Sequence, residues 1–192
     1  MKEVITPENT RLFAEQRIEE NVRHDFVVNR KVPVATGDIP RGAPFDLGCE
    51  FHDLLYRIAD RKALSARERR FLPWLVTCRD ALRENGAGYL EPEVELEAGS
   101  NLPKGRCDLM AHGGLAELGI IEVKVVGHLP AEPEDAHLLQ VAGYAVLAEE
   151  IYDEHRIWAA VAYVSLRQRQ VRLFVHKGTG RLRAISRHLI AA

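Results

Sequence analysis

The feature that most constrains the fold of this chain is an apolar segment interrupted by one acid and one base. Residues Leu118 to Val126 are rich in isoleucine and valine, which predicts a central β-strand. Glu122 and Lys124 are two residues apart in it, so their side chains leave the same face. Burying a carboxylate and an ammonium group costs free energy unless they are paired or bound to metal. A structural ion pair on an edge strand would give the same short pattern, but the apolar flanks favour a functional site.

A second carboxylate is expected opposite this pair. Gly105 to Ala111 predicts a short strand that carries Asp108, and a turn begins at His112. If the connecting loop is centred near Leu115, Asp108 and Glu122 are equidistant from it and face each other. Two carboxylates then converge beside an ammonium group, and hard cations such as Mg²⁺ favour oxygen ligands of this kind.

The rest of the pattern predicts an α/β protein with a mixed sheet flanked by helices. Helices are expected at Pro7–Val22, at Leu47–Ala63, from an N-cap at Ser65 with Glu68 completing a capping box to about Asn85, at Glu134–Glu150 and at Arg181–Ile190. Further extended segments are expected at Val27–Thr36, Glu93–Glu97, Trp158–Ser165 and Gln170–His176. We expect one globular unit, with residues 1–44 as an N-terminal, partly helical extension packed on a core of residues 45–192.

Charge is unevenly distributed along the chain. The net charge is -2, which alone argues against a nucleic-acid partner, yet no Asp or Glu follows His155. That stretch carries Arg156, Arg167, Arg169, Arg172, Lys177, Arg181, Arg183 and Arg187. A second basic group comprises Arg57, Arg61, Lys62, Arg67, Arg69 and Arg70. Basic runs near catalytic carboxylates suit a polyanion, although ordinary solvated surface charge explains either run equally well.

The cysteines and apolar runs indicate the cellular compartment in which the protein is expected. Cys49, Cys78 and Cys107 form an odd, scattered set without a CxxC pair, which argues against a disulfide framework, a zinc finger or an iron–sulfur site. No secretory signal and no apolar run of membrane-spanning length is evident. We therefore expect a cytoplasmic protein that does not enter the membrane.

Two further blocks lie at helical spacing on either side of the predicted carboxylates. Gly48 and His52 fall on the helix upstream, and Gln140 and Tyr144, four residues apart, share one face of the helix downstream. Each block alone is weak. In this order, the four blocks resemble the nuclease domains of RecB-like exonucleases and of CRISPR-associated RecB-like nucleases, which belong to the PD-(D/E)XK superfamily. The resemblance covers roughly residues 45–176 and implies a restriction-endonuclease-like core.

The resemblance implies a role for each matching residue. Asp108 and Glu122 would ligate Mg²⁺ or Mn²⁺, with the backbone carbonyl of Val123 and the side chain of His52 as further ligands. Lys124 would orient the attacking water and offset charge on the phosphate. Gln140 and Tyr144 would hold the substrate backbone or support the site. We further expect DNA to cross the site beside the Gln140 helix, with Arg181 and Arg183 contacting its phosphates.

The implied activity is metal-dependent hydrolysis of DNA phosphodiester bonds, in repair or recombination or in defence against foreign DNA. Unlike the CRISPR-associated relatives, this chain has no cysteine after Cys107, so no iron–sulfur cluster is expected. It also lacks a nucleotide-binding loop, so any motor or recruitment factor would be a partner protein. A catalytically inactive module that binds DNA or a partner, and an RNA nuclease, remain alternatives. Exonuclease, endonuclease and junction resolvase are likewise open, as is the oligomeric state.

Overall fold

The structure is a computed structural model and describes residues 24–33, 39–40, 42, 44–59, 62–97, 104–114, 117–153, 155–180 and 182–184. The predicted helix Pro7–Val22, Arg181 and most of the predicted last helix lie outside these residues; residues 182–184 are helical. The elements are β1 (Phe26–Lys31), α2 (Pro44–Ala59), the 3₁₀ helix η2 (Glu68–Phe71), α3 (Leu72–Glu84), β2 (Tyr89–Leu96), β3 (Gly105–His112), β4 (Glu117–Val125), α4 (Asp135–Ile151), β5 (Arg156–Ser165) and β6 (Gln170–His176).

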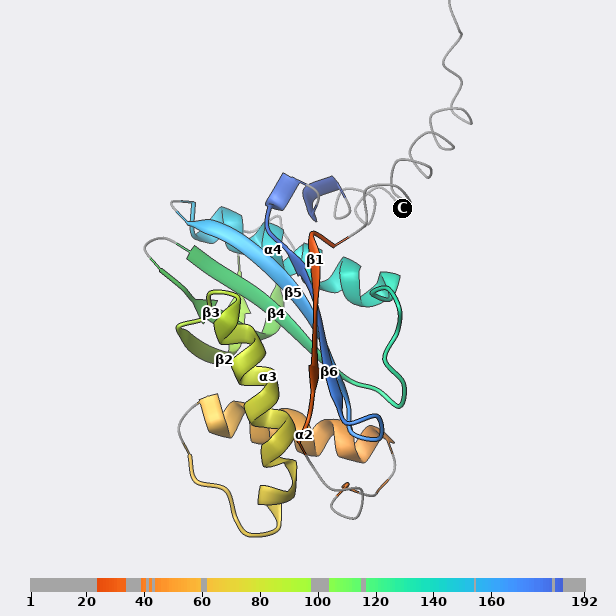
Figure 1. Cartoon of the computed structure of the whole chain (residues 1–192). Helices are drawn as coiled ribbons and strands as arrows, with labels where there is room; N and C mark the ends of the chain where they lie inside the picture. Colours follow the sequence, from red (N-terminus) through yellow and green to blue (C-terminus); the bar gives the residue numbers. More distant parts are fainter. Residues whose placement is uncertain are drawn as a thin grey trace, which may run out of the picture.

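The described strands form one six-stranded sheet in the order β1-β6-β5-β4-β3-β2 (Figure 1). Neighbouring strands are antiparallel except β4 and β5, which are parallel and joined by the crossover helix α4. One apolar cluster, with residues such as Phe51 and Trp74, packs α2 and α3 against one face of the sheet. A second cluster, with residues such as Val141, packs α4 against the other. The α/β class with a mixed sheet flanked by helices is therefore confirmed.

The hairpin that carries the candidate carboxylates has the register expected from the sequence. Leu109 pairs with Ile121, and His112 with Leu118. These residue numbers are symmetric about Leu115, so one further step along the strands brings Asp108 opposite Glu122. The predicted register of the two strands is thus confirmed, and it decides which side chains can meet at the site.

Several predicted boundaries shift for identifiable reasons. β1 ends at Lys31, and Pro33 has no N–H to continue the ladder. The rest of the segment predicted to reach Thr36, residues 34–36, lies outside the described residues. β1 lies within the predicted extension of residues 1–44, yet it is an edge strand of the core sheet and pairs with β6. At the other edge, β2 begins four residues earlier than predicted and tolerates Pro92, as an edge strand can.

The helices also differ from the predicted spans at their ends. α2 runs from Pro44 to Ala59 instead of from Leu47 to Ala63. Ser65 and Glu68 do exchange the two capping-box hydrogen bonds, N to Oε2 at 2.6 Å and N to Oγ at 3.4 Å. The segment that follows is a 3₁₀ turn, and the α-helix starts only at Leu72. Pro73 explains the break, because it cannot donate a backbone hydrogen bond to the preceding turn. No helix in the described part of the chain is long and apolar enough to cross a membrane.

Candidate functional site

Asp108 lies where β3 and β4 begin to separate. The last backbone pair on this side of the hairpin is Leu109 with Ile121. Beyond it, Asp108 Oδ2 accepts a hydrogen bond from the backbone N–H of Val123 at 2.7 Å. The side chain thus takes the place of a strand partner, which satisfies a buried N–H and fixes the carboxylate at the opening between the strands.

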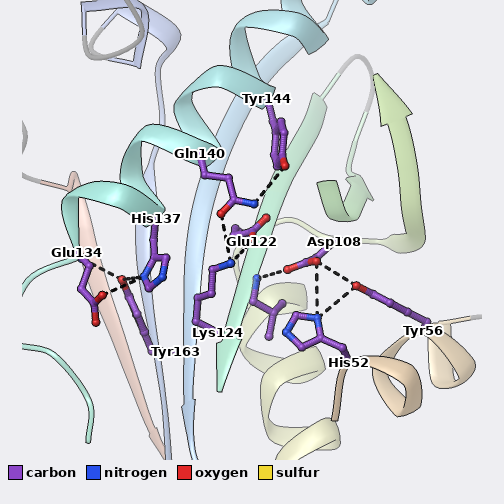
Figure 2. A network of polar contacts seen from close by, with 11 residues as sticks. His52, Tyr56, Asp108, Glu122, Lys124, Glu134, His137, Gln140, Tyr144 and Tyr163 are labelled. Atoms are coloured by element: carbon purple, nitrogen blue, oxygen red, sulfur yellow. Dashed lines mark hydrogen bonds and ion pairs between the residues drawn. The ribbon is translucent and has the colours of Figure 1, made fainter. Parts of the chain in front are cut away.

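Helix α2 sends two side chains to the same carboxylate. His52 and Tyr56 are one helical turn apart and so share a face. The Tyr56 hydroxyl donates to Asp108 Oδ1 at 3.0 Å, and His52 Nδ1 lies 3.2 Å from the Tyr56 hydroxyl and 3.6 Å from Asp108 Oδ1 (Figure 2). The predicted proximity of His52 to Asp108 is confirmed. Burial, and next the charge of Asp108, raise the pKa of Tyr56, so the phenol stays protonated and acts as a donor.

Glu122 is an almost fully buried carboxylate with one oxygen unused. Its residue is only 2% exposed. Lys124 Nζ donates to Glu122 Oε1 at 2.5 Å, whereas Oε2 has no hydrogen-bond partner among the described residues. Burial first, and the charge of Asp108 second, raise the pKa of Glu122 to about 7. A buried carboxylate oxygen without a donor is costly, and a bound cation would remove that cost.

Gln140 and Tyr144 reach this pair from α4. Gln140 Oε1 accepts from Lys124 Nζ at 3.2 Å, and Gln140 Nε2 donates to the Tyr144 hydroxyl at 3.1 Å. Figure 2 shows the chain of contacts from Tyr144 through Gln140 to Lys124. The Lys124 ammonium group can only donate, so the amide oxygen faces it and Nε2 is left to donate to the Tyr144 hydroxyl. Within the described contacts, Gln140 thus orients Lys124.

Gly105 makes this arrangement sterically possible. The Tyr144 ring lies so close to the start of β3 that a Cβ atom at Gly105 would come within 2.6 Å of Tyr144 Cε1. Any side chain at this position would therefore displace the ring that holds Gln140. Close packing against Tyr144 therefore explains why glycine occupies position 105, at the start of the strand that carries Asp108.

A further polar cluster lies beside Lys124 and was not predicted from the sequence. The Tyr163 hydroxyl contacts His137 Nδ1 and accepts the backbone N–H of Glu134, each at 2.9 Å. Tyr163 pairs with Lys124 across β4 and β5, so both side chains face α4. Burial, and next the charge of Lys124, lower the pKa of His137. The contacts fasten the start of α4 to the sheet. The sequence gives only a weak signal for this cluster, which is helical spacing. His137 lies three residues before Gln140, and could therefore have been placed on the same face of the helix.

The predicted phosphate-binding arginines are not part of this cluster. Arg183 Nε is 2.6 Å from Glu149 Oε2, on the part of α4 beyond Tyr144. Arg181 lies outside the described residues. Contact between these residues and DNA therefore stays a prediction.

The site opens into a hollow of about 620 Å³, named here the Asp108 hollow. It is lined by Tyr56, Glu93, Glu95, Leu96, Glu97, Lys104, Gly105, Arg106, Cys107, Asp108, Gln140 and Tyr144. In the described part of the chain, no three His, Cys, Asp or Glu residues are grouped closely enough to hold a metal ion. Both Asp108 oxygens accept hydrogen bonds, from the Tyr56 hydroxyl and the Val123 N–H, and the Lys124 ammonium group occupies Oε1 of Glu122. The oxygen donors, their mutual repulsion and the unpartnered Glu122 Oε2 nevertheless fit a divalent cation.

Comparison with known proteins adds little. No protein-family model matches the sequence, and no curated protein gives a significant match. Among solved structures, one described as "Crystal structure of SSO0001" superposes with a TM-score of 0.39 at 15% sequence identity, over 95% of this chain and 86% of that chain. A likeness this weak carries no argument about function.

Proposed function

We propose that this protein is a Mg²⁺- or Mn²⁺-dependent nuclease of the PD-(D/E)XK type that hydrolyses phosphodiester bonds of DNA. The observation that carries the proposal is the unpartnered Oε2 of buried Glu122, held between the Asp108 carboxylate and the Lys124 ammonium group. A structural ion pair has no need for a second, part-buried carboxylate that raises the pKa of the first. A cation site beside a phosphate site uses all three groups.

Each side chain has a chemical role in this reaction. A divalent cation bound to the carboxylates would lower the pKa of water and offset negative charge on the phosphate. Asp108 and Glu122 supply the oxygens that hold it, and Val123 and His52 are the further ligands that the family resemblance implies. Lys124 carries positive charge to the position where negative charge develops during hydrolysis. Gln140 keeps Lys124 in place, and Tyr56 holds Asp108 through its hydroxyl.

Cleavage is expected to depend strictly on a divalent cation. Purified protein should cut linear, circular or single-stranded DNA with Mg²⁺ or Mn²⁺, should not cut in EDTA, and should recover when either cation is restored. RNA of the same sequence is the matched substrate. Preferential cutting of RNA would show that the protein is an RNA nuclease instead. Full activity in EDTA would rule out the metal mechanism.

Cation affinity is expected to fall as the pH drops below 7. The pKa of Glu122 is raised to about 7, so a proton competes with the cation for this carboxylate below that pH. One competing proton weakens apparent affinity about tenfold per pH unit below the pKa. Titration with Mn²⁺, followed by calorimetry, should therefore give roughly tenfold weaker binding at pH 6 than at pH 8. Equal affinity at the two pH values would show that Glu122 is not a ligand.

A further inference from the structure

Tyr89 is an exposed aromatic residue at the start of β2. It is 49% exposed and is the more exposed of the two exposed large hydrophobic residues in the described part of the chain; the other is Leu72, at 39%. Its ring lies beside His112, with 5.7 Å between ring centroids and 37° between the planes. His112 Nε2 is in turn 2.9 Å from Glu91 Oε2. The ring is therefore supported from behind while much of its surface faces solvent, as in a platform for stacking.

Tyr89 lines a second hollow that connects with the candidate site. This Tyr89 groove measures about 460 Å³ and is lined by Asp53, Tyr56, Arg57, Lys62, Tyr89, Glu91, Pro92 and Glu93. Tyr56 and Glu93 also line the Asp108 hollow. A chain-like ligand that has one unit at Asp108 can thus continue past Tyr56 into the Tyr89 groove.

The charges of the Tyr89 groove decide which part of a nucleotide it would hold. Three acids, Asp53, Glu91 and Glu93, outnumber Arg57 and Lys62. Arg57 is moreover engaged by Glu68 and by the carbonyl of Ala63. The groove therefore offers no net attraction for phosphates. An aromatic face binds nucleobases whatever their charge environment, so a base rather than a phosphate is the fitting occupant.

On the other side of Tyr89, the charged residues that line the surface are basic. A smaller hollow of about 200 Å³ shares Tyr89 and is lined by Arg79 and Arg83 but by no acid, although Arg79 is paired with Asp80 at 2.8 Å. Phosphates that the Tyr89 groove does not attract can be accommodated there. The order from the site outward is thus a reaction centre, an aromatic platform and a pair of arginines.

We propose that Tyr89 stacks on a base of the strand whose scissile phosphate lies at Asp108 and Glu122; this rests on the proposed nuclease function. Tyr89 pairs with His112, four residues from Asp108 along β3. At about 3.3 Å per residue this separation is ~13 Å. A stacked strand rises about 3.4 Å per nucleotide, so the base on Tyr89 is roughly four nucleotides from the cut, or about two if the strand is extended.

The test measures binding of a fluorescent single-stranded oligonucleotide by anisotropy in Mg²⁺, with K124A as the background so that the strand is not cut. Tyr89→Ala should weaken binding about 5- to 100-fold with an unchanged salt dependence, because stacking is not ionic. Tyr89→Trp should keep the affinity. Leu72→Ala is the matched control, since among the described residues Leu72 is the other exposed large hydrophobic residue and lines none of the three hollows. Thermal unfolding of each variant checks folding.

Oligonucleotides with one abasic position identify the contacted base. An abasic position two to four nucleotides from the cut should weaken binding to the protein with Tyr89 and should have no effect on Tyr89→Ala. Binding within twofold of normal for Tyr89→Ala, or no sensitivity to abasic positions, would overturn the platform even if the wild type cleaves DNA. Tyr89-dependent binding together with a wild type that cleaves no nucleic acid would overturn the nuclease proposal and leave the platform standing.

Discussion

Replacement of Lys124 by alanine is expected to lower the rate of DNA cleavage about 10²- to 10⁴-fold and to leave DNA binding nearly intact. The ammonium group lies 2.5 Å from Glu122 Oε1 and is held by Gln140, so it is fixed next to the carboxylates rather than on an open surface. It would act on the reacting phosphate, whereas most affinity comes from contacts elsewhere along the strand. Single-turnover cleavage and anisotropy on the same oligonucleotide separate the two effects.

Lys31→Ala is the matched control for this variant. Lys31 is an exposed lysine on β1, which is separated from β4 by β6 and β5. The Lys31→Ala variant should cleave DNA at the wild-type rate. Normal cleavage by Lys124→Ala would show that the strand carrying Glu122 and Lys124 does not take part in the reaction. A large loss of DNA binding would show that Lys124 binds the substrate instead.

Glu122→Gln is expected to abolish cation binding and cleavage and yet to stabilise the cation-free protein at pH 8. Burial and Asp108 raise the pKa of Glu122 from 4.5 to about 7. Between these values the folded protein holds a proton that the unfolded chain has released, so this group's contribution to stability falls as the pH rises through that window. At pH 8 the native state bears an unfavourable charge. Glutamine removes it, for a gain of up to about 3 kcal/mol, less what the lost Lys124 contact contributes.

Thermal unfolding in EDTA and Mn²⁺ calorimetry check this pair of effects. The melting temperature of Glu122→Gln at pH 8 should rise by a few degrees, the advantage should vanish at pH 4, and no Mn²⁺ heat should be seen. Asp108→Asn provides the comparison, because it relieves the same repulsion while keeping an acceptor for the Val123 N–H. A Glu122→Gln protein that melts earlier than wild type at pH 8 would mean that Glu122 is a structural partner of Lys124.

The sequence predicted the parts of the site that depend on local spacing. Strand periodicity placed Glu122 and Lys124 on one face, and the symmetry of the hairpin placed Asp108 opposite Glu122. His52 was expected near the carboxylates only through the family resemblance, because a position on a helix does not reveal which strand the helix packs on. The Tyr56 hydroxyl bond and the His137–Tyr163 contact depend on such packing, and so were missed.

Local sequence patterns also could not predict which strands, distant in the sequence, pair with each other. The extended character of the segment near Val27 was evident, but nothing local indicated that it would pair with Val171–Val175 at the edge of the sheet. The 3₁₀ turn before α3 shows a different limit. The capping box at Ser65 and Glu68 forms, yet Pro73 prevents a continuous α-helix across that point.

The position of β2 at the sheet edge has a consequence for amide hydrogen exchange around the candidate site. Edge strands open locally at a lower free energy than central ones, and β2 is hydrogen-bonded on one side only, to β3. β4 is held between β3 and β5, and its residues from Leu118 to Val123 are buried. Amides of β2 should therefore exchange early and those around Glu122 late. The wall of the Asp108 hollow that carries Glu93 can open transiently while Glu122, Lys124 and the helix above them keep their places.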